Sequence, residues 1–157
     1  MPNWCINHLA VLGTKDELKR FETMIKGPNG EIDFNKIVPY PARYKGYDGY
    51  NSGGGYEWCI ENWGTKWNAC RIEKEVYENH LFYIFETAWE PPLKIVSALN
   101  KEYPELEIEL HYNECGNSFS GKITAKGNTV KEEFRPWCDC DECSKILEDF
   151  NSYGLEI

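Results

Sequence analysis

The sequence predicts an α+β protein built around one antiparallel sheet of the split βαβ type. Strand-like and helix-like periodicities follow each other along the chain in the order strand, helix, two strands, helix, strand. Residues 81–88 are nearly all apolar or aromatic, which is typical of a strand at the centre of a sheet. At 157 residues with 41% hydrophobic composition, the chain is long enough for one well-buried core and too short for two.

The first predicted strand covers residues 4–13 and leads directly into a helix. Thr14 and Glu17 have the spacing of a capping box, which starts that helix. The apolar residues of its buried face recur at helical spacing, at Leu18, Phe21 and Ile25. Gly27-Pro28 ends the helix, and a short extended piece is expected over residues 33–38.

A long loop is predicted over residues 40–56, because glycines alternate there with tyrosines. A short helix is expected to follow over residues 56–63 and to end at Gly64, a residue suited to the left-handed conformation of a helix C-terminus. Residues 70–77 and 81–88 then predict a hairpin.

The second half of the chain predicts a second long helix and two further strands. Pro91-Pro92 suits the first turn of a helix that continues over residues 93–103. Apolar and polar residues alternate over residues 106–112, which indicates a half-buried strand. A further strand is expected over residues 118–126, and a short C-terminal helix over residues 141–153.

Short motifs at scattered positions resemble those of a known family. They are Met1-Pro2-Asn3-Trp4-Cys5, Asp33-Phe34, Pro39-x-Pro41, Glu61-Asn62-Trp63-Gly64-Thr65-Lys66-Trp67-Asn68-Ala69, Thr87-Ala88-Trp89-x-Pro91-Pro92 and Glu114-x-Gly116-x-x-Phe119-x-Gly121. In this order they resemble the YubB-type ferredoxin-like domain family of bacteriophages and conjugative plasmids. The resemblance implies a ferredoxin-like fold and a mobile-element origin, but no settled activity. We therefore expect a ferredoxin-like domain over residues 1–126, with residues 40–69 as an insertion, and a C-terminal extension over residues 127–157 packed on the same domain.

The net charge of -9 is concentrated in the second half of the chain. Residues 1–71 carry 9 Lys and Arg against 8 Asp and Glu, and residues 72–157 carry 8 against 18. An acidic surface repels phosphate backbones, so direct nucleic-acid binding is not expected, whereas a basic protein partner would be attracted. Solubility alone also explains such an excess.

No run of apolar residues reaches the about 20 that a membrane span needs, and the N-terminus lacks a signal-peptide core. We therefore expect a cytoplasmic protein, in the cytoplasm of a host cell, whose seven cysteines are reduced.

The tryptophan-rich segment over residues 61–69 has two interpretations. Its two indoles can be structural anchors of a tight corner, locked by an ion pair between Glu61 and Lys66. Alternatively, aromatic walls with a few directed polar groups form a pocket for a flat ligand such as a nucleotide or cyclic nucleotide. The residues predicted for that pocket are Glu61, Trp63, Lys66, Trp67, Asn68 and Trp89.

Three cysteines fall within six residues at Cys138, Cys140 and Cys143, at the start of the predicted C-terminal helix. This spacing fits a structural zinc site, for which Cys115, His111 or Cys5 would have to supply the fourth ligand. Ordinary reduced thiols give the same pattern. No other cofactor is predicted.

Two surfaces are candidates for binding a protein. The glycine-rich loop presents Tyr44, Tyr47 and Tyr50, whose rigid rings on an adaptable backbone suit a protein contact. Glu105, Glu107 and Glu109 fall on one face of their predicted strand about 6.6 Å apart, close to the spacing of phosphates in a nucleic acid. A surface loop insertion and a solvated sheet face are the simpler explanations of the two patterns.

Catalysis is not expected, because the three histidines lie in unremarkable contexts. The leading hypothesis is a non-enzymatic phage or plasmid accessory protein that binds and inhibits a host protein. The partner would be a basic nucleic-acid-binding defence enzyme, so the role would be anti-defence, for example anti-CRISPR. The alternative is a small-ligand module that binds a nucleotide at the tryptophan corner.

Overall fold

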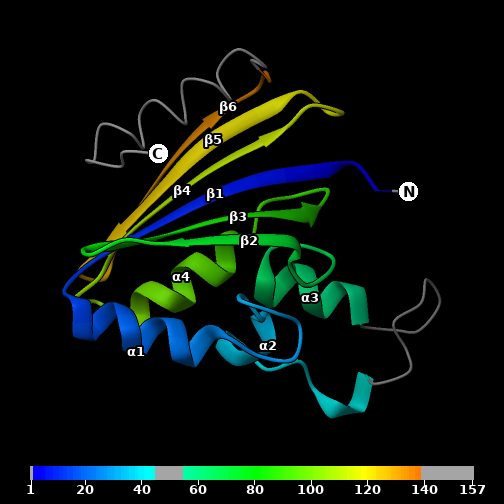
Figure 1. The fold of residues 1–157 in the computed structure, drawn as a ribbon. Coiled ribbons are helices and arrows are strands. Elements are labelled where there is room, and N and C mark those ends of the chain that lie inside the picture. Colours follow the sequence, from blue (N-terminus) through cyan, green and yellow to red (C-terminus); the bar gives the residue numbers. More distant parts are fainter. Residues whose placement is uncertain (1, 45–54, 139–157) are drawn as a thin grey trace.

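The computed structural model describes residues 2–44 and 55–138. Its main feature is one six-stranded sheet with the strand order β2-β3-β1-β4-β5-β6, in which every neighbouring pair is antiparallel. The helices lie together on one face of this sheet (Figure 1). The strands are β1 (Trp4–Leu12), β2 (Cys70–Val76), β3 (His80–Ala88), β4 (Glu107–Glu114), β5 (Phe119–Lys126) and β6 (Thr129–Arg135). The helices are α1 (Lys15–Ile25), α2 (Phe34–Ile37), the 3-10 turn η1 (Ala42–Tyr44), α3 (Gly55–Trp63) and α4 (Leu93–Glu102).

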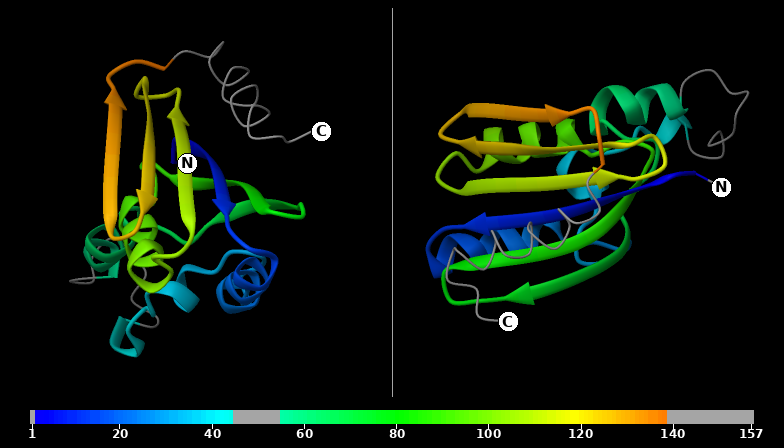
Figure 2. Two further views of the ribbon diagram at one scale, coloured as in Figure 1. Left: turned by 90° about the vertical axis from the view of Figure 1, so that its left-hand side faces the viewer. Right: turned by 90° about the horizontal axis from the view of Figure 1, so that it is seen from above.

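Four strands form the split βαβ core that the sequence predicts. In β2-β3-β1-β4, the strands joined through α1 have β3 between them, and the strands joined through α4 have β1 between them. The hairpin of β5 and β6 extends this core at the β4 edge (Figure 2). The predicted α+β fold class is therefore confirmed, with one strand more than expected.

The first helix begins as predicted. The Thr14 side chain accepts a hydrogen bond from the Glu17 backbone N–H, and the Glu17 carboxylate accepts one from the Thr14 N–H at 2.9 Å. Leu18, Phe21 and Ile25 are buried against the sheet and its neighbouring helices. The helix starts where two otherwise unpaired backbone donors are satisfied by side chains.

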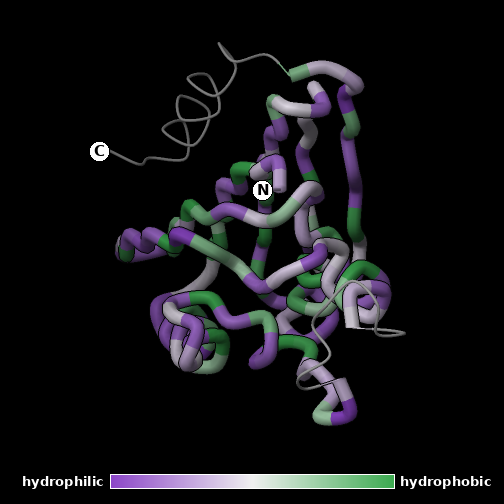
Figure 3. Tube along the Cα trace, turned by 90° about the vertical axis from the view of Figure 1, so that its right-hand side faces the viewer, coloured by the Kyte–Doolittle hydropathy of each residue, from purple (hydrophilic) through white to green (hydrophobic). Residues whose placement is uncertain are grey.

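Green, hydrophobic segments of the strands and helices are interspersed with purple, hydrophilic ones (Figure 3). In β1, Cys5, Leu9 and Val11 enter the main core beneath the sheet. The intervening residues point to the other face, where Ala10 and Phe82 form a second, smaller apolar cluster. Both faces of the sheet centre are therefore partly apolar.

Three sequence-based expectations are wrong. Residues 34–37 form the short helix α2 in place of an extended piece, because Asp33 caps it by accepting a hydrogen bond from the Asn35 N–H at 3.0 Å. Strand β6 was not predicted at all. Strand β4 is buried along nearly its whole length, whereas a half-buried strand was expected.

No helix among the described residues is long and apolar enough to cross a membrane. The predicted helix over residues 141–153 lies outside the described residues.

Candidate functional site

Trp63 anchors the tryptophan-rich segment in the core. Its side chain is only 4% exposed, and its ring packs edge-on against Phe34 and Trp58 with both centroid distances at 5.6 Å. The indole Nε1–H donates a hydrogen bond of 2.8 Å to the Val38 carbonyl. Trp63 therefore satisfies its one polar group inside the protein, as the structural interpretation of this residue requires.

Gly64 and Thr65 turn the chain sharply after α3. Gly64 has a φ of +85°, and a Cβ atom built there would lie 2.9 Å from the backbone nitrogen of Leu93. Only glycine fits this position without displacing α4. Thr65 is fully buried, and its hydroxyl donates a hydrogen bond of 2.9 Å to the Ala88 carbonyl. These two residues join α3 to the end of β3 and the start of α4.

Asn68 ties the same segment to the Asp33 turn. Its amide oxygen accepts hydrogen bonds from the backbone N–H groups of Phe34 and Ala69, both at 2.9 Å. Its amide nitrogen donates to the Asp33 carboxylate, also at 2.9 Å. The amide thus makes three internal hydrogen bonds, so its main role is structural even though it borders the cavity described next.

An open cavity of about 350 Å³ lies over this corner. It is lined by residues of α2, α3, the Pro39–Tyr44 region and the tryptophan-rich segment. The lining residues are Asn35, Tyr40, Gly55, Tyr56, Cys59, Trp63, Lys66, Trp67 and Asn68. Four of these nine are aromatic, which gives the cavity flat apolar walls of the kind that a planar ligand contacts.

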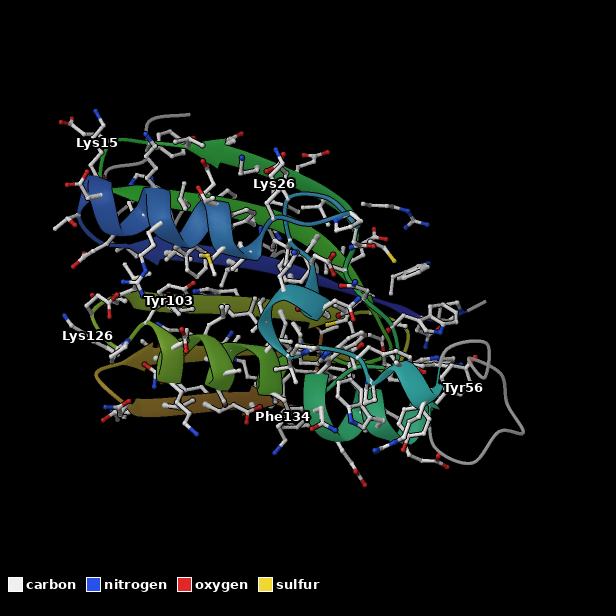
Figure 4. The ribbon with its side chains drawn as sticks, turned by 90° about the horizontal axis from the view of Figure 1, so that it is seen from below. Lys15, Lys26, Tyr56, Tyr103, Lys126 and Phe134 are labelled. Atoms are coloured by element: carbon white, nitrogen blue, oxygen red, sulfur yellow. The ribbon has the colours of Figure 1, made fainter. Side chains whose placement is uncertain are left out.

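Lys66 supplies the positive charge of the cavity. Its ammonium nitrogen lies 4.4 Å from the ring centroid of Tyr56 and 5.0 Å from that of Trp67. Tyr56 sits at the N-terminal end of α3 (Figure 4), so the ammonium group bridges the two sides of the cavity. A cation held over two aromatic faces is positioned to meet an anionic group of a ligand that stacks on the same walls.

The aromatic row continues past the cavity. Trp67 lies 6.3 Å from Trp4 between ring centroids, and the Arg71 guanidinium lies 4.8 Å from the Trp4 centroid. Arg71 also forms an ion pair with Glu86. The row therefore holds three aromatic rings and two cations, in the order Tyr56, Lys66, Trp67, Trp4 and Arg71.

Asn35 brings a side-chain amide to the cavity. Asn35 is exposed, and its amide oxygen accepts a hydrogen bond of 3.1 Å from the Tyr40 N–H. Within the described part of the chain, no hydrogen bond uses the Asn35 amide nitrogen. A planar heteroaromatic ring with acceptor atoms would match this donor.

The predicted pocket residues are only partly brought together. Trp63, Lys66, Trp67 and Asn68 line the cavity, as predicted. Glu61 is exposed and Trp89 is 39% exposed, and neither is among the lining residues. Four further lining residues were not predicted from the sequence, namely Asn35, Tyr40, Tyr56 and Cys59. The two tyrosines border the glycine-rich loop, and their aromatic character was the signal that could have placed them here.

The residues of the two predicted protein-binding surfaces differ in burial, and some lie outside the described residues. Tyr44 is half-buried and packs on Tyr40 at 5.9 Å between centroids, while Tyr47 and Tyr50 lie outside the described residues. Glu105 is exposed and precedes β4. Glu107 and Glu109 share the sheet face away from the helices.

Glu109 does not belong to a solvated acidic surface. It is 3% exposed, and its carboxylate lies 2.5 Å from His111 Nε2 and 3.5 Å from Lys122 Nζ. The expected exposed row of three glutamates is therefore wrong at this residue.

The structure brings two of the predicted zinc ligands together. The Sγ atoms of Cys115 and Cys138 are 2.9 Å apart. Cys140 and Cys143 lie outside the described residues. Cys5 is fully buried in the main core, and burial raises the pKa of its thiol, which disfavours the thiolate form that binds metals. No group of three or more possible metal-binding side chains occurs within residues 2–44 and 55–138.

A second cavity of about 450 Å³ lies between α3, α4 and the β5–β6 hairpin. Its rim includes the exposed side chains of Ile60 and Phe134, the latter labelled in Figure 4. The Tyr112 hydroxyl donates to Glu132 at 2.8 Å, and burial together with this hydrogen bond raises the pKa of Tyr112. Because the buried Tyr112 hydroxyl is used internally, this cavity is a weaker candidate than the aromatic one.

Comparisons with known proteins agree with the fold. The family model described as a ferredoxin-like domain in Api92-like protein matches residues 62–154, which is more than half of the chain. The crystal structure of a protein api92 from Yersinia pseudotuberculosis has a TM-score of 0.67 to this chain at 10% sequence identity. The alignment covers 85% of this chain and 98% of that chain. No curated protein matches the sequence. At this identity the likeness shows the fold alone.

Proposed function

The chain belongs to the family of ferredoxin-like domains in Api92-like proteins, and from this premise we propose that it is a non-enzymatic module that binds a nucleotide or cyclic nucleotide in the aromatic cavity. The observation that carries the proposal is the placement of Lys66 over the rings of Tyr56 and Trp67 at the wall of an open cavity. A nucleobase needs flat apolar walls, and a phosphate needs a cation beside them.

The size of the cavity is consistent with this ligand class. Its volume of about 350 Å³ falls near the lower end of the range of small-molecule sites, which is roughly 300–1,000 Å³. The supporting wall is rigid, because Trp63, Thr65 and Asn68 are fixed by internal hydrogen bonds. A rigid site loses less conformational entropy on binding than a mobile one.

The test is a titration of the purified chain with a panel of mononucleotides, cyclic nucleotides and their phosphate-free nucleosides, followed by calorimetry. Lys66→Met should weaken binding of a phosphate-bearing ligand by about 10-fold or more, as loss of a charged hydrogen bond does, and should leave nucleoside binding nearly unchanged. Trp67→Ala should weaken both. Lys94→Met, which changes a lysine outside this cavity, is the matched control.

The proposal fails if every compound of the panel binds the parent protein no more tightly than the Trp67→Ala variant. If Lys66→Met weakens the binding of nucleotides and nucleosides equally, Lys66 does not bind the phosphate, and only binding of the ring in the cavity remains.

A second proposal is that the chain is a phage- or plasmid-borne inhibitor of a host defence protein, as the resemblance to mobile-element proteins suggests. Exposed apolar side chains on and after the edge strand β6 favour a protein contact of some kind, namely Val130 at 39%, Phe134 at 59% and Trp137 at 55% exposure. The acidic part of this hypothesis is weakened, because Glu109 is buried in an ion pair. Affinity purification from a plasmid-bearing or infected host tests it.

A further inference from the structure

The outer edge of strand β6 is uncovered within the part of the chain that the structure describes. Strand β6 lies at one end of the sheet (Figure 2), and among the described residues it pairs only with β5. The chain that follows β6 turns back toward β5, where the Cys138 N–H donates to the Ser118 hydroxyl at 3.1 Å. The Ser120 hydroxyl likewise donates to the Trp137 carbonyl at 2.9 Å. An uncovered edge strand leaves alternate backbone N–H and C=O groups open to pair with another strand.

The two edges of the sheet differ in regularity. Strand β6 pairs with β5 residue for residue over its whole length, from Thr129 to Arg135. Strand β2, at the other end of the sheet, has a register shift between Cys70 and Glu73. Such an irregularity bends an edge strand and interrupts its row of outward backbone groups, which protects a sheet against edge-to-edge pairing. Strand β6 carries no such interruption, so its whole edge can pair.

The sequence of β6 is complementary to itself in the antiparallel orientation. Two copies of the strand can pair with Glu132 at the centre. Lys131 of each copy then lies opposite Glu133 of the other copy, and in the same register Val130 lies opposite Phe134. Opposite charges and apolar side chains directly across from each other are the cross-strand pairs that stabilise a sheet. Each pair occurs twice, because the arrangement has twofold symmetry.

The side chains that would meet lie on matching faces of the sheet. Val130 pairs with Ala125, a residue of the main core, so Val130 and Phe134 lie on the face that carries the helices. Lys131 and Glu133 alternate with them and lie on the other face. All four are exposed. Within residues 2–44 and 55–138, neither Lys131 nor Glu133 forms an ion pair, so both charges can pair across the edge.

Glu132 would lie opposite its own copy, but its carboxylate is bound within its own chain. The Tyr112 hydroxyl of β4 donates to it at 2.8 Å. Tyr112 reaches β6 across Gly121 of β5, where any side chain would collide with the tyrosine hydroxyl. The Glu132 carboxylate is therefore drawn toward β5 and away from the edge, which keeps the two like charges apart.

We propose that β6 pairs antiparallel with β6 of a second copy of this chain and joins the two sheets into one. The dimer closes, because each copy uses the same strand and the irregular edge of β2 does not extend the sheet further. One pair of short strands is a small contact, so the dimer should be reversible and dissociate on dilution. No residue of β6 lines the aromatic cavity, so this proposal is independent of the proposed function.

The test is sedimentation equilibrium of the full chain from about 1 μM to about 1 mM, the range in which small interfaces associate. The average mass should rise with concentration from that of one chain to that of two. Lys131→Glu and Glu133→Lys should each weaken dimerisation by about 10-fold or more, because each change turns two opposite-charge pairs into two like-charge pairs. The variant with both changes should dimerise like the parent, since the exchanged charges again meet their opposites.

Two controls separate this pairing from general electrostatic effects. The single changes alter the net charge of -9 in opposite directions, so repulsion between acidic chains does not explain a loss of dimerisation in both. Glu73→Lys makes the same charge change as Glu133→Lys at an exposed position of β2, and it should leave dimerisation unchanged.

Hydrogen exchange of the parent tests the same surface without any variant. The backbone amides of β6 should exchange more slowly at about 1 mM than at about 1 μM, and those of β2 should exchange equally at both concentrations. The proposal is overturned if the parent stays a monomer up to about 1 mM or if its mass rises beyond that of two chains. It is also overturned if concentration protects another segment in place of β6, or if the double variant dimerises as weakly as the single variants.

Discussion

Trp63 and Trp67 allow a paired test of how the corner is built, because Trp63→Ala and Trp67→Ala delete the same atoms from neighbouring positions. Trp63 is 4% exposed and donates a hydrogen bond to Val38, whereas Trp67 is half-buried at the cavity wall. The change in the unfolded chain is nearly the same for both variants, so the difference between them reports the folded state.

For Trp63→Ala we expect a loss of about 3–5 kcal/mol in the free energy of unfolding, because a large buried aromatic side chain leaves a cavity and an unpaired carbonyl. In a chain of this size, about 1 kcal/mol lowers the melting temperature by about 2–4 °C, so the expected shift is about 6–20 °C. Trp67→Ala should cost less, about 1 kcal/mol, since Trp67 is only half-buried.

The measurement is urea unfolding followed by far-ultraviolet circular dichroism, which does not depend on tryptophan fluorescence. The slope of the free energy against urea should be equal in both variants and the parent, because each unfolds the same surface. The reasoning is refuted if Trp67→Ala is destabilised as much as Trp63→Ala, or if Trp63→Ala melts like the parent.

Two further predictions concern the backbone turn and the pH dependence of stability. Gly64→Ala should destabilise the protein by roughly 1–3 kcal/mol, because its positive φ and the close Leu93 nitrogen exclude a Cβ. Gly127 also has a positive φ but no atom within 4 Å of a Cβ, so Gly127→Ala should destabilise the protein less in the same unfolding measurement. His8 is buried, and burial followed by the charge of His111 lowers its pKa from 6.5 to about 4. As the pH falls, the unfolded chain therefore takes up a proton on His8 before the folded protein does. The free energy of unfolding of the parent should fall by about 3 kcal/mol between pH 6.5 and pH 4, and a His8→Asn variant should not show this loss. Parallel pH profiles of the two proteins would contradict this.

The sequence predicted those elements whose signals are local. The capping box of Thr14 and Glu17, the left-handed Gly64 and the apolar run of β3 each depend on neighbouring residues, and the structure confirms all three. Helix α2 was missed because four residues are too few to show a helical period. Strand β6 was missed because it is an edge strand whose residues are nearly all exposed, so no burial pattern marks it.

The site was predictable only in part, since it depends on residues that meet through the fold. Lys66 and Trp67 could be placed together from the sequence because they lie in one short motif, while Tyr40 and Asn35 reach the cavity from other elements. Alternation placed Glu109 on the correct face of the sheet, but not its burial beside His111, because that pairing depends on what surrounds the face in three dimensions.

The central position of β1 determines when the protein can fold during synthesis. This nine-residue strand pairs with β3 and β4. The sequence separation of the paired residues ranges from 68, between Leu12 and His80, to 109, between Cys5 and Glu114. At translation rates of about 5–20 residues per second, β1 waits roughly 5–20 s for its second partner to be made. Until β3 is made, its apolar residues have no strand to pair with. Aggregation of nascent chains therefore competes with folding chiefly at the N-terminal strand, and slower translation lengthens that exposure.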